Sequence, residues 1–439
     1  MPDFISIVDG VSQFAHAAFI NVNLENFFRC LFYFAFFYPV FMSYVWITGA
    51  LVYWWRRERG KTHTVDFPPT LSEYPGVSIL VPCFNESLVA EETISFLMKQ
   101  NYPTFEIIAI NDGSSDDTAE ILDRLAERYE NVRVIQFKEN QGKAMALRAG
   151  ALLSQYEFLI CIDGDALLSP NASTWIMKHF LSSPRVGAVT GNPRIRTRST
   201  LLGRIQVGEF SAVVGLIKRS QRIYGRLFSV SGVVTGFRKA ALHRVGYWSI
   251  DMITEDIDIT WKLQMDYWDV RFEANATSWI LMPETIKGLW NQRLRWAQGG
   301  AEVMIRYLTK LMNWRSRRMW PVFLDYFASL FWSYTILFVF LLFILQQFMP
   351  LPEMLRSHIY MPEWLGLLFG MTFTLQFGVS MMIDSRYEKD VGKIYYWLIW
   401  YPLVYWLIIV ATAIVAFPKA LFKRGGTRAV WTSPDRGLR

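Results

Sequence analysis

The sequence predicts an α/β domain with a doubly wound, mostly parallel sheet, flanked by transmembrane and interfacial helices. One observation behind this is the uneven distribution of charge along the 439 residues. Residues 1–55 and 321–417 hold 14 charged side chains in 152 positions, about 9%, whereas residues 56–320 hold 62 in 265, about 23%. The central segment therefore has the composition of a soluble domain, and the flanks have that of membrane segments. This distribution excludes a disordered chain, a fibre and a small disulfide scaffold, and it argues against a fully water-soluble enzyme.

The second observation is that short apolar runs alternate with helical patterns in the central segment. Five runs are predicted to be strands: 77–84, 105–111, 132–137, 157–162 and 186–190. Four segments between them are predicted to be helices: 91–100, 117–130, 142–154 and 171–181. This alternation is typical of a largely parallel sheet, whose ligands bind beyond the carboxyl ends of the strands.

The first flank contains a clear transmembrane helix. Residues 30–55 carry no charge and are long enough to span a bilayer. Basic residues follow at once, whereas residues 1–28 hold three acids and no Lys or Arg, which places the N-terminus outside and residue 56 onward in the cytoplasm. Segment 11–20 is short and only mildly apolar, so we expect it to lie at the membrane surface, with an extra span as the alternative.

The second flank is predicted to leave and re-enter the cytoplasm through residues 327–349 and 361–383. A fourth apolar stretch, 394–417, is interrupted by Pro402. A full crossing would place the tail outside, but four basic tail residues favour the inside: Lys419, Lys423, Arg424 and Arg428. We therefore expect residues 394–422 to bend back or to lie partly in the interface.

These segments divide the chain into six parts. The predicted parts are a periplasmic or interfacial segment (1–29), a transmembrane helix (30–55), a cytoplasmic domain (56–289), interfacial amphipathic helices (290–318), a transmembrane region (321–417) and a cytoplasmic tail (418–439).

Polar residues follow three of the predicted strands. Asn85 and Glu86 follow the first, Asp112 follows the second, and Asp163 and Asp165 follow the fourth. Strand ends of a parallel sheet meet at one edge, so these clusters indicate a shared site. The aspartates at i and i+2 can turn toward one ligand, and such hard oxygen donors suit Mg²⁺ or Mn²⁺, with phosphate oxygens completing the shell. A solvated turn is the alternative explanation for this pair alone.

A second acidic group lies about 90 residues further on, at Thr254, Glu255 and Asp256. A helix N-cap is the alternative explanation, with Thr254 capping and the acids stabilised by the helix dipole, and both interpretations can hold. The three cysteines and five histidines are scattered, so neither a disulfide framework nor a His-ligated metal is expected.

Residues 185–244 hold twelve basic residues and one acid, Glu209, a local charge of +11 against +7 for the whole chain. Nucleic acid, the anionic cytoplasmic leaflet and a diphosphate-bearing substrate are candidate partners for such a block. Because apolar flanks lie on both sides, we rank the leaflet first and expect no nucleic acid.

An amphipathic pattern precedes the second flank. Apolar residues recur with helical period at positions 290, 294, 297, 301, 304, 308 and 311, with Glu302, Arg306 and Lys310 opposite. This predicts an interfacial helix leading into the next span. In the functional interpretation, the same helix turns Arg295 and Trp296 toward an active site.

Taken together, these motifs resemble those of the membrane-embedded processive glycosyltransferases of family 2, which include cellulose, chitin and hyaluronan synthases. The ordered set is PCFNE (82–86), DGS (112–114), DGD (163–165), TED (254–256) and QRLRW (292–296). The resemblance covers roughly residues 75–320 and the apolar flanks. It implies a GT-A type fold for the 56–289 domain.

Further segments are similar to those of the bacterial synthases of the biofilm polymer poly-β-1,6-N-acetyl-D-glucosamine: NPRIRTR (192–198), IQVGE (205–209), MPET (282–285) and WTSPDRG (431–437). This implies an inverting, processive transfer of N-acetyl-D-glucosamine from UDP-GlcNAc, in the bacterial inner membrane, with passage of the polymer across it. A synthase of another β-linked polymer (hyaluronan, chitin or cellulose) is the alternative, followed by a transporter with a nucleotide-binding domain.

The resemblance also implies roles for individual residues on the donor side. Asp112 and Lys143 would hold the uridine part of the UDP-sugar, near Asn85 and Glu86. The diphosphate would bind Asp163 and Asp165 through a divalent cation. Gln292 and Arg295 would steady the leaving diphosphate, and Arg436 of the tail would close over it.

On the acceptor side, the resemblance makes Asp256, beside Glu255, the general base. Ser231 and Gly232 would form the acceptor site, and Trp296 would stack on the terminal sugar of the growing polysaccharide. Three or four spans are few to enclose a polymer channel, which motivates a small membrane subunit as partner. The resemblance adds possible control by cyclic di-GMP.

Overall fold

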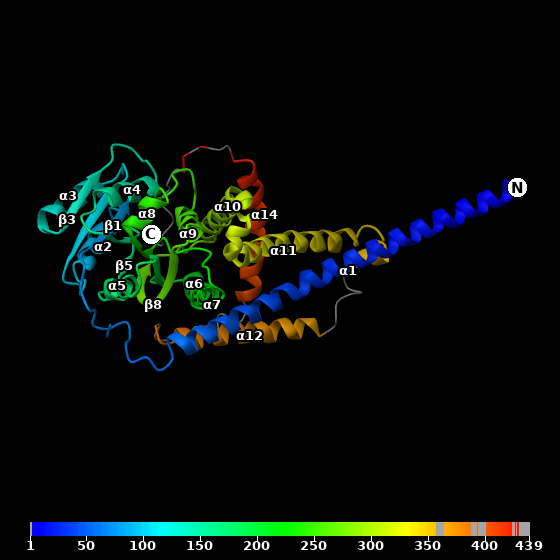
Figure 1. Ribbon diagram of the computed structural model, residues 1–439, viewed down its shortest axis with the longest axis horizontal. Coiled ribbons are helices and arrows are strands. Elements are labelled where there is room, and N and C mark those ends of the chain that lie inside the picture. Colours follow the sequence, from blue (N-terminus) through cyan, green and yellow to red (C-terminus); the bar gives the residue numbers. More distant parts are fainter. Residues whose placement is uncertain are drawn as a thin grey trace.

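The computed structural model describes residues 2–356, 364–387 and 401–423, together with positions 393, 426, 428 and 429. A sheet domain forms one end of the molecule, and three long helices extend from it to the other side (Figure 1). The N-terminus lies at the far end of the longest helix, well away from the sheet (Figure 1).

The sheet contains eight strands in the order β3-β2-β1-β4-β7-β6-β8-β5. Their bounds are β1 Val77–Cys83, β2 Phe105–Asn111, β3 Val132–Gln136, β4 Phe158–Ile162, β5 Leu167–Leu168, β6 Val186–Ile195, β7 Val234–Arg238 and β8 Asp269–Ile280. The first four strands pair in parallel, as the sequence predicts. β7 is antiparallel to both β4 and β6, so the sheet is mixed, and the sequence reasoning missed β5, β7 and β8.

Helices cover both faces of the sheet because alternate residues of the central strands point to opposite sides. Ile79 and Val81 of β1 pack with α2 (Ala90–Leu97), α3 (Thr118–Arg128) and α5 (Ala172–Ser182). Leu80 packs on the opposite face with α4 (Lys143–Leu153), α8 (Lys239–Arg244) and α9 (Glu255–Met265). Every residue of β1 is buried, as expected for a strand covered on two sides. The four predicted helices are confirmed, with ends that differ by a few residues.

A helical segment that the sequence reasoning did not identify runs from 201 to 224. It consists of α6 (Leu201–Phe210), the π-helix η1 (Ser211–Ile217) and α7 (Lys218–Tyr224). Leu216 packs against Ile47 and Ala50 of α1 and against Ile383 of α12. The 201–224 segment therefore connects the sheet domain to the long helices.

Within the described residues, three helices are long and apolar enough to cross a membrane: Asn23–Arg57, Trp314–Leu345 and Leu365–Asp384. They belong to α1 (Pro2–Arg57), to η2 (Trp314–Met319) followed by α11 (Trp320–Leu345), and to α12 (Leu365–Asp384). Many of their large apolar side chains are exposed, among them Phe41 and Leu367. Residues 11–20 continue the helix of the first span and do not form a separate element.

The fourth apolar stretch forms α14 (Tyr401–Leu421), and residues 394–400 lie outside the described part. α14 runs beside α10 (Ile286–Leu311) and crosses the direction of α11 and α12 (Figure 1). Just after α14, Lys423 Nζ donates to the carbonyl of Asp251 at 2.7 Å and pairs with Glu302 at 2.8 Å. The end of α14 is therefore fixed to the sheet domain, and the bend of residues 394–422 stays a prediction.

The amphipathic pattern of α10 is confirmed only in part. Ala301, Met304 and Leu311 are buried, but Leu308 is exposed. Glu302 is also buried, because it pairs with Lys423, and so it does not lie on a solvent face as predicted.

The basic block 185–244 does not form a free positive patch. Acids from outside the block pair with its side chains: Glu92 with Arg196, Asp266 with Arg244, and Asp269 with Arg222. Part of the +11 is therefore neutralised within the fold, and binding of this block to the leaflet stays a prediction.

Three further ion pairs join four residues into a buried network that we call the anchor cluster: Glu58, Arg194, Arg219 and Asp384. Arg219 Nε lies 2.7 Å from Glu58 and its Nη1 lies 3.3 Å from Asp384, which also lies 2.7 Å from Arg194. All four side chains are at most 6% exposed. Asp384 ends α12 and Glu58 follows α1, so the cluster joins two candidate spans to the 201–224 segment and to β6.

Candidate active site

One lysine links the polar residues after β4 to the acidic motif at the start of α9. Lys143, the first residue of α4, lies 2.5 Å from Asp163 Oδ1 and 3.1 Å from Glu255 Oε1. Burial would lower the pKa of Lys143, but Asp163 and Glu255 hold it well above its ordinary value. Lys143 therefore stays charged and connects the end of β4 to the first turn of α9, two motifs about 90 positions apart. We call Lys143, Asp163, Asp165, Glu255 and Asp256 the carboxylate cluster.

Asp165 is buried beside Asp163 at the end of β4. Burial, reinforced by the charge of Asp163, raises the pKa of Asp165 from 3.8 to about 7. A divalent cation would relieve both effects, and two carboxylates separated by one residue are donors that Mg²⁺ and Mn²⁺ accept. The described residues contain no group of three or more metal-ligating side chains. These two carboxylates therefore fit a cation that takes its other ligands from a substrate.

Asp256 lies in the first turn of α9, half-buried and next to Gly232. A side chain at Gly232 would meet Lys143 Nζ at 3.3 Å and Asp256 Oδ2 at 3.5 Å. Burial and the neighbouring Glu255 raise the pKa of Asp256 from 3.8 to about 6, and Lys143 partly opposes this. The lack of a side chain at Gly232 leaves space for a ligand between the lysine and the carboxylate.

The predicted cap at Thr254 is wrong in its chemistry. Thr254 is the N-cap residue of α9 by position, but its side chain makes no capping hydrogen bond. A side chain at Gly299 of α10 would meet Thr254 Oγ1 at 2.0 Å. Thr254 instead packs against α10 at Gly299, which has no side chain, so that this helix lies against the Thr254–Glu255–Asp256 motif.

Asp112 holds the loop that leads into α4. Its two carboxylate oxygens accept the backbone N–H groups of Gln141 at 2.7 Å and Gly142 at 2.9 Å. Burial raises the pKa of Asp112, and the two amides oppose the shift. Gly142 has φ +89°, and a side chain there would meet the carbonyl of Ala429 at 2.6 Å. Only glycine suits this backbone and this close approach.

The C-terminal tail therefore crosses this loop. Ala429 donates its N–H to the carbonyl of Ile250 at 2.9 Å, and Arg428 donates to the side chain of Gln141. Arg436 lies outside the described residues.

Asn85 and Glu86 shape the end of β1. Asn85 has φ +55°, donates its N–H to Ser114 Oγ and accepts the N–H of Ser115 at 2.9 Å in each case. Glu86 is 1% exposed, and its N–H donates to Thr118 at 2.8 Å. A side chain at Gly164 would meet Glu86 Cγ at 3.2 Å, so Glu86 lies directly behind the Asp163–Asp165 turn.

The QRLRW motif starts within the second turn of α10 and lies near Asp256. Arg295 is close enough to lower the pKa of Asp256, and Trp296 is partly exposed. Gln292 accepts a hydrogen bond from Arg293, a residue that the sequence reasoning did not single out. Arg293 pairs with the buried Glu209 of α6 at 2.7 Å and stacks on Trp296 at 4.2 Å. The sequence feature that could have revealed this pair is Glu209, the one acid in a basic block, together with the arginine inside the QRLRW motif.

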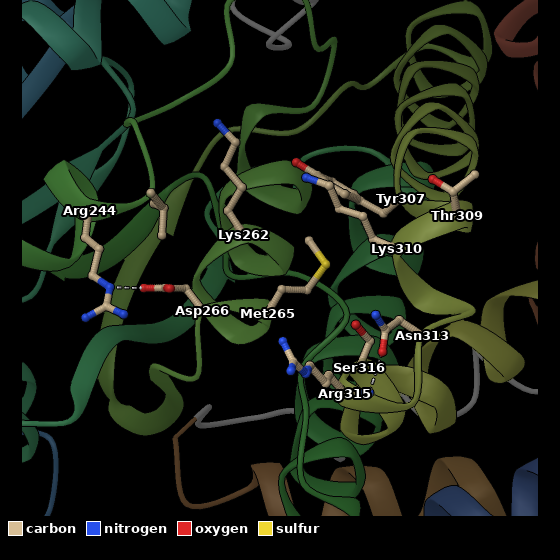
Figure 2. Close-up of a pocket in the computed structure, with 11 residues that line it drawn as sticks. Arg244, Lys262, Met265, Asp266, Tyr307, Thr309, Lys310, Asn313, Arg315 and Ser316 are labelled. Atoms are coloured by element: carbon tan, nitrogen blue, oxygen red, sulfur yellow. Dashed lines mark hydrogen bonds and ion pairs between the residues drawn. The ribbon is translucent and has the colours of Figure 1, made fainter.

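A cavity of about 670 Å³ lies elsewhere, beyond the last turn of α9. Figure 2 shows Arg244 paired with Asp266 on one side of it and Lys310 and Arg315 on the other. None of the predicted site residues that the structure describes lines it. Because Asp256 is in the first turn of α9 and Asp266 follows the last, this cavity is separate from the carboxylate cluster.

Comparison with known proteins agrees with this geometry. The sequence profile of Glycosyl transferase family 2 matches residues 78–246, which carry the sheet from β1 to β7. The chain is 40% identical to a poly-β-1,6-N-acetyl-D-glucosamine synthase of Staphylococcus epidermidis over 93% of its own length and 98% of the relative. A synthase of the same name from Staphylococcus aureus is 41% identical over 92% and 98%. The chain belongs to the poly-β-1,6-N-acetyl-D-glucosamine synthase family within glycosyltransferase family 2.

The fold of this glycosyltransferase is also found in a solved structure. A mannosyltransferase from Pyrobaculum calidifontis, determined with GDP-mannose and Mn²⁺, aligns with a TM-score of 0.55 over 91% of this chain and 99% of that one. At 18% identity, this likeness shows the GT-A-like fold with its flanking helices. The described part of the chain contains three helices long and apolar enough to cross a membrane, so the glycosyltransferase is a membrane-associated enzyme.

Proposed function

We propose that this glycosyltransferase polymerises N-acetyl-D-glucosamine from UDP-GlcNAc into poly-β-1,6-N-acetyl-D-glucosamine and passes the chain across a bacterial inner membrane for a biofilm matrix. The observation that carries the proposal is the bridge from Lys143 to Asp163 and Glu255, which brings a candidate diphosphate site and a candidate base into one cluster. The names of the two staphylococcal relatives supply the sugar and the linkage.

On the donor side, Asp163 and Asp165 would hold a divalent cation that neutralises the diphosphate and supports its departure. The Mn²⁺ and nucleotide-sugar in the solved mannosyltransferase support such a requirement. Lys143 keeps its charge beside them and contributes a fixed positive group. Asp112 shapes the 140–142 loop, placing backbone groups for the uridine.

On the acceptor side, Asp256 would take the proton of the acceptor hydroxyl as its oxygen bonds to the anomeric carbon. The bond from that carbon to the diphosphate oxygen breaks on the opposite face, which inverts the anomeric configuration and releases UDP. Arg295 faces this region and is placed to stabilise the departing charge. Trp296, stacked on Arg293, offers an aromatic face to the terminal acceptor sugar.

The membrane arrangement that fits this activity has a cytoplasmic catalytic domain and several spans. The contacts of Lys423 and Ala429 with the sheet domain support a tail on the same side as the carboxylate cluster. They would let Arg436 reach the diphosphate. The three candidate spans among the described residues support the further proposal that a small membrane subunit completes the export path, with control by cyclic di-GMP as an additional input.

The test is a product analysis. Membranes containing the full chain are incubated with Mg²⁺ and radiolabelled UDP-GlcNAc, and in parallel with UDP-glucose or UDP-glucuronate. We expect polymer from UDP-GlcNAc alone, degraded by a hydrolase specific for β-1,6-linked N-acetylglucosamine and resistant to chitinase. Polymer that chitinase degrades, or that requires a second sugar, would contradict the assigned product. Membranes with Asp256→Asn are the matched control.

A further inference from the structure

The 201–224 segment brings a lysine to the acceptor side of the carboxylate cluster. Lys218 is the first residue of α7 and directly follows the π-helix Ser211–Ile217. Its Nζ lies 3.5 Å from Thr190 Oγ1 of β6. The same oxygen accepts the N–H of Ser231 at 2.7 Å, in the Ser231–Gly232 turn beside Asp256. Lys218 is therefore joined to this turn through Thr190, and Lys143 contacts the same turn at the carbonyl of Gly232.

The neighbourhood of Lys218 differs from that of other basic residues in its block. Among the described residues, the hydrogen-bond partner of its ammonium is the Thr190 hydroxyl alone, although an ammonium carries three donors. The carboxylate that acts on it is Asp256. Burial lowers the pKa of Lys218 from 10.5 to about 8, which leaves it mostly charged at neutral pH. Lys218 is therefore a half-buried cation that keeps spare hydrogen-bond donors and forms no salt bridge with the described residues.

The backbone that carries Lys218 is rigidly held. The next residue, Arg219, is fully buried in the anchor cluster between Glu58 and Asp384. At the other end of the segment, Glu209 pairs with Arg293 and Phe210 packs against Trp296. The π-helix between them is a deviation from regular helix that often occurs at functional sites. One segment thus reaches from the predicted sugar-stacking tryptophan to the turn beside the base.

We propose that Lys218 binds the growing chain, by donating a hydrogen bond to an oxygen of the terminal acceptor sugar while Asp256 faces the attacking hydroxyl. This rests on the proposed function, because it requires a sugar acceptor next to Asp256. The oxygen can be a hydroxyl or the N-acetyl carbonyl, since an ammonium donates to either. Lys218 is then a specificity residue for the acceptor and makes no contact with the donor.

The experiment separates acceptor binding from donor chemistry. Purified full-length enzyme in detergent is given UDP-GlcNAc with a β-1,6-linked N-acetylglucosamine oligosaccharide as acceptor. Transfer to the oligosaccharide is measured beside the slow hydrolysis of UDP-GlcNAc without acceptor. For Lys218→Met we expect the KM for the acceptor to rise about 10- to 100-fold, as for the loss of one hydrogen bond from a charged donor. The KM for UDP-GlcNAc and the rate of hydrolysis should stay within about twofold.

Further variants keep the inference falsifiable. Lys218→Arg should recover part of the acceptor affinity, and Lys178→Met, which removes an exposed lysine of α5, should match the wild type. A de-acetylated acceptor distinguishes the two oxygens, because it retains the effect of Lys218→Met only if a hydroxyl is the partner. An equal fall in the rates of transfer and of hydrolysis for Lys218→Met would overturn the inference. So would a shift of the acidic side of the pH–activity profile with an unchanged KM for the acceptor. Wild-type enzyme that hydrolyses UDP-GlcNAc but transfers nothing to the oligosaccharide would refute the proposed function instead.

Discussion

The anchor cluster and the carboxylate cluster both remove charge from water, but they differ in balance and in access. In the anchor cluster two arginines face two carboxylates, and no side chain is more than 6% exposed. In the carboxylate cluster one lysine faces four carboxylates, and Lys143 and Asp163 are 16% and 24% exposed. A balanced, closed network holds parts of the molecule together, whereas an unbalanced, open one is prepared to bind a cation and to accept a proton.

The largest expected effect comes from unbalancing the anchor cluster. Arg219→Met would leave the buried Glu58 without its arginine, while Asp384 would keep only Arg194. Removing one partner of a buried ion pair costs about 3–5 kcal/mol. We expect thermal unfolding in detergent to begin well below the wild-type temperature, with little folded enzyme recovered from membranes. Unchanged thermal stability would show that the network does not hold the helices to the sheet domain.

In the carboxylate cluster, by contrast, we expect removal of a charge to stabilise the fold. The fold raises the pKa of Asp165 from 3.8 to about 7, so its contribution to the free energy of unfolding falls as the pH rises from about 4 to about 7, and a neutral side chain removes this penalty. Asp165→Asn should raise the free energy of unfolding by on the order of 1 kcal/mol near pH 8. The same variant should weaken Mg²⁺-dependent UDP binding at least tenfold, as measured by calorimetry. A variant that is less stable yet binds UDP normally would reverse the assigned role of this carboxylate.

The acid limb of the activity profile should report Asp256. A general base must be ionised, and burial and Glu255 raise the pKa of Asp256 to about 6. Polymer synthesis at low UDP-GlcNAc should therefore fall about tenfold per pH unit below this value and level off above it. Glu255→Gln removes the neighbouring charge and should move the limb toward lower pH. A profile that is flat from pH 5 to 7 would contradict this assignment.

The smallest effect is expected for an ion pair of the same basic block at the surface. Arg196 and Glu92 lie 2.6 Å apart, but their side chains are 35% and 47% exposed. Exposed pairs contribute about 0–1 kcal/mol, so Arg196→Gln should leave thermal stability and synthesis close to wild type. A loss of thermal stability comparable to that of Arg219→Met would show that burial and charge balance do not decide how much an ion pair contributes.

The parts of this fold that local pattern determines were predictable, and the parts that depend on distant contacts were not. The strands at 77–83, 105–111 and 158–162 are short apolar runs with polar residues at their ends, so both the sheet and the placement of Asp112 and Asp163 at strand ends followed. β7 begins directly after the Ser231–Gly232 turn and inserts antiparallel between β4 and β6, a placement that no local period indicates.

The same reason explains the missed residues. Arg219 and Asp384 are separated by 165 positions and Arg293 and Glu209 by 84, so each looked like one more charge in a block or a helix. Lys218 carries no signal of its own in the sequence, because its place beside Asp256 depends on a π-helix and on the burial of its neighbour.

The most direct test of the account is Asp256→Asn. The substitution keeps the size of the side chain and removes the base, while Asp163, Asp165 and Lys143 stay in place. Loss of general base catalysis is typically worth about 10²–10⁴-fold, so membranes with this variant should make no detectable polymer from UDP-GlcNAc. Binding of UDP with Mg²⁺ should remain within about threefold of wild type, because one hydrogen-bonding group is replaced by another. Polymer output equal to wild type at normal UDP affinity would show that the carboxylate cluster does not contain the base.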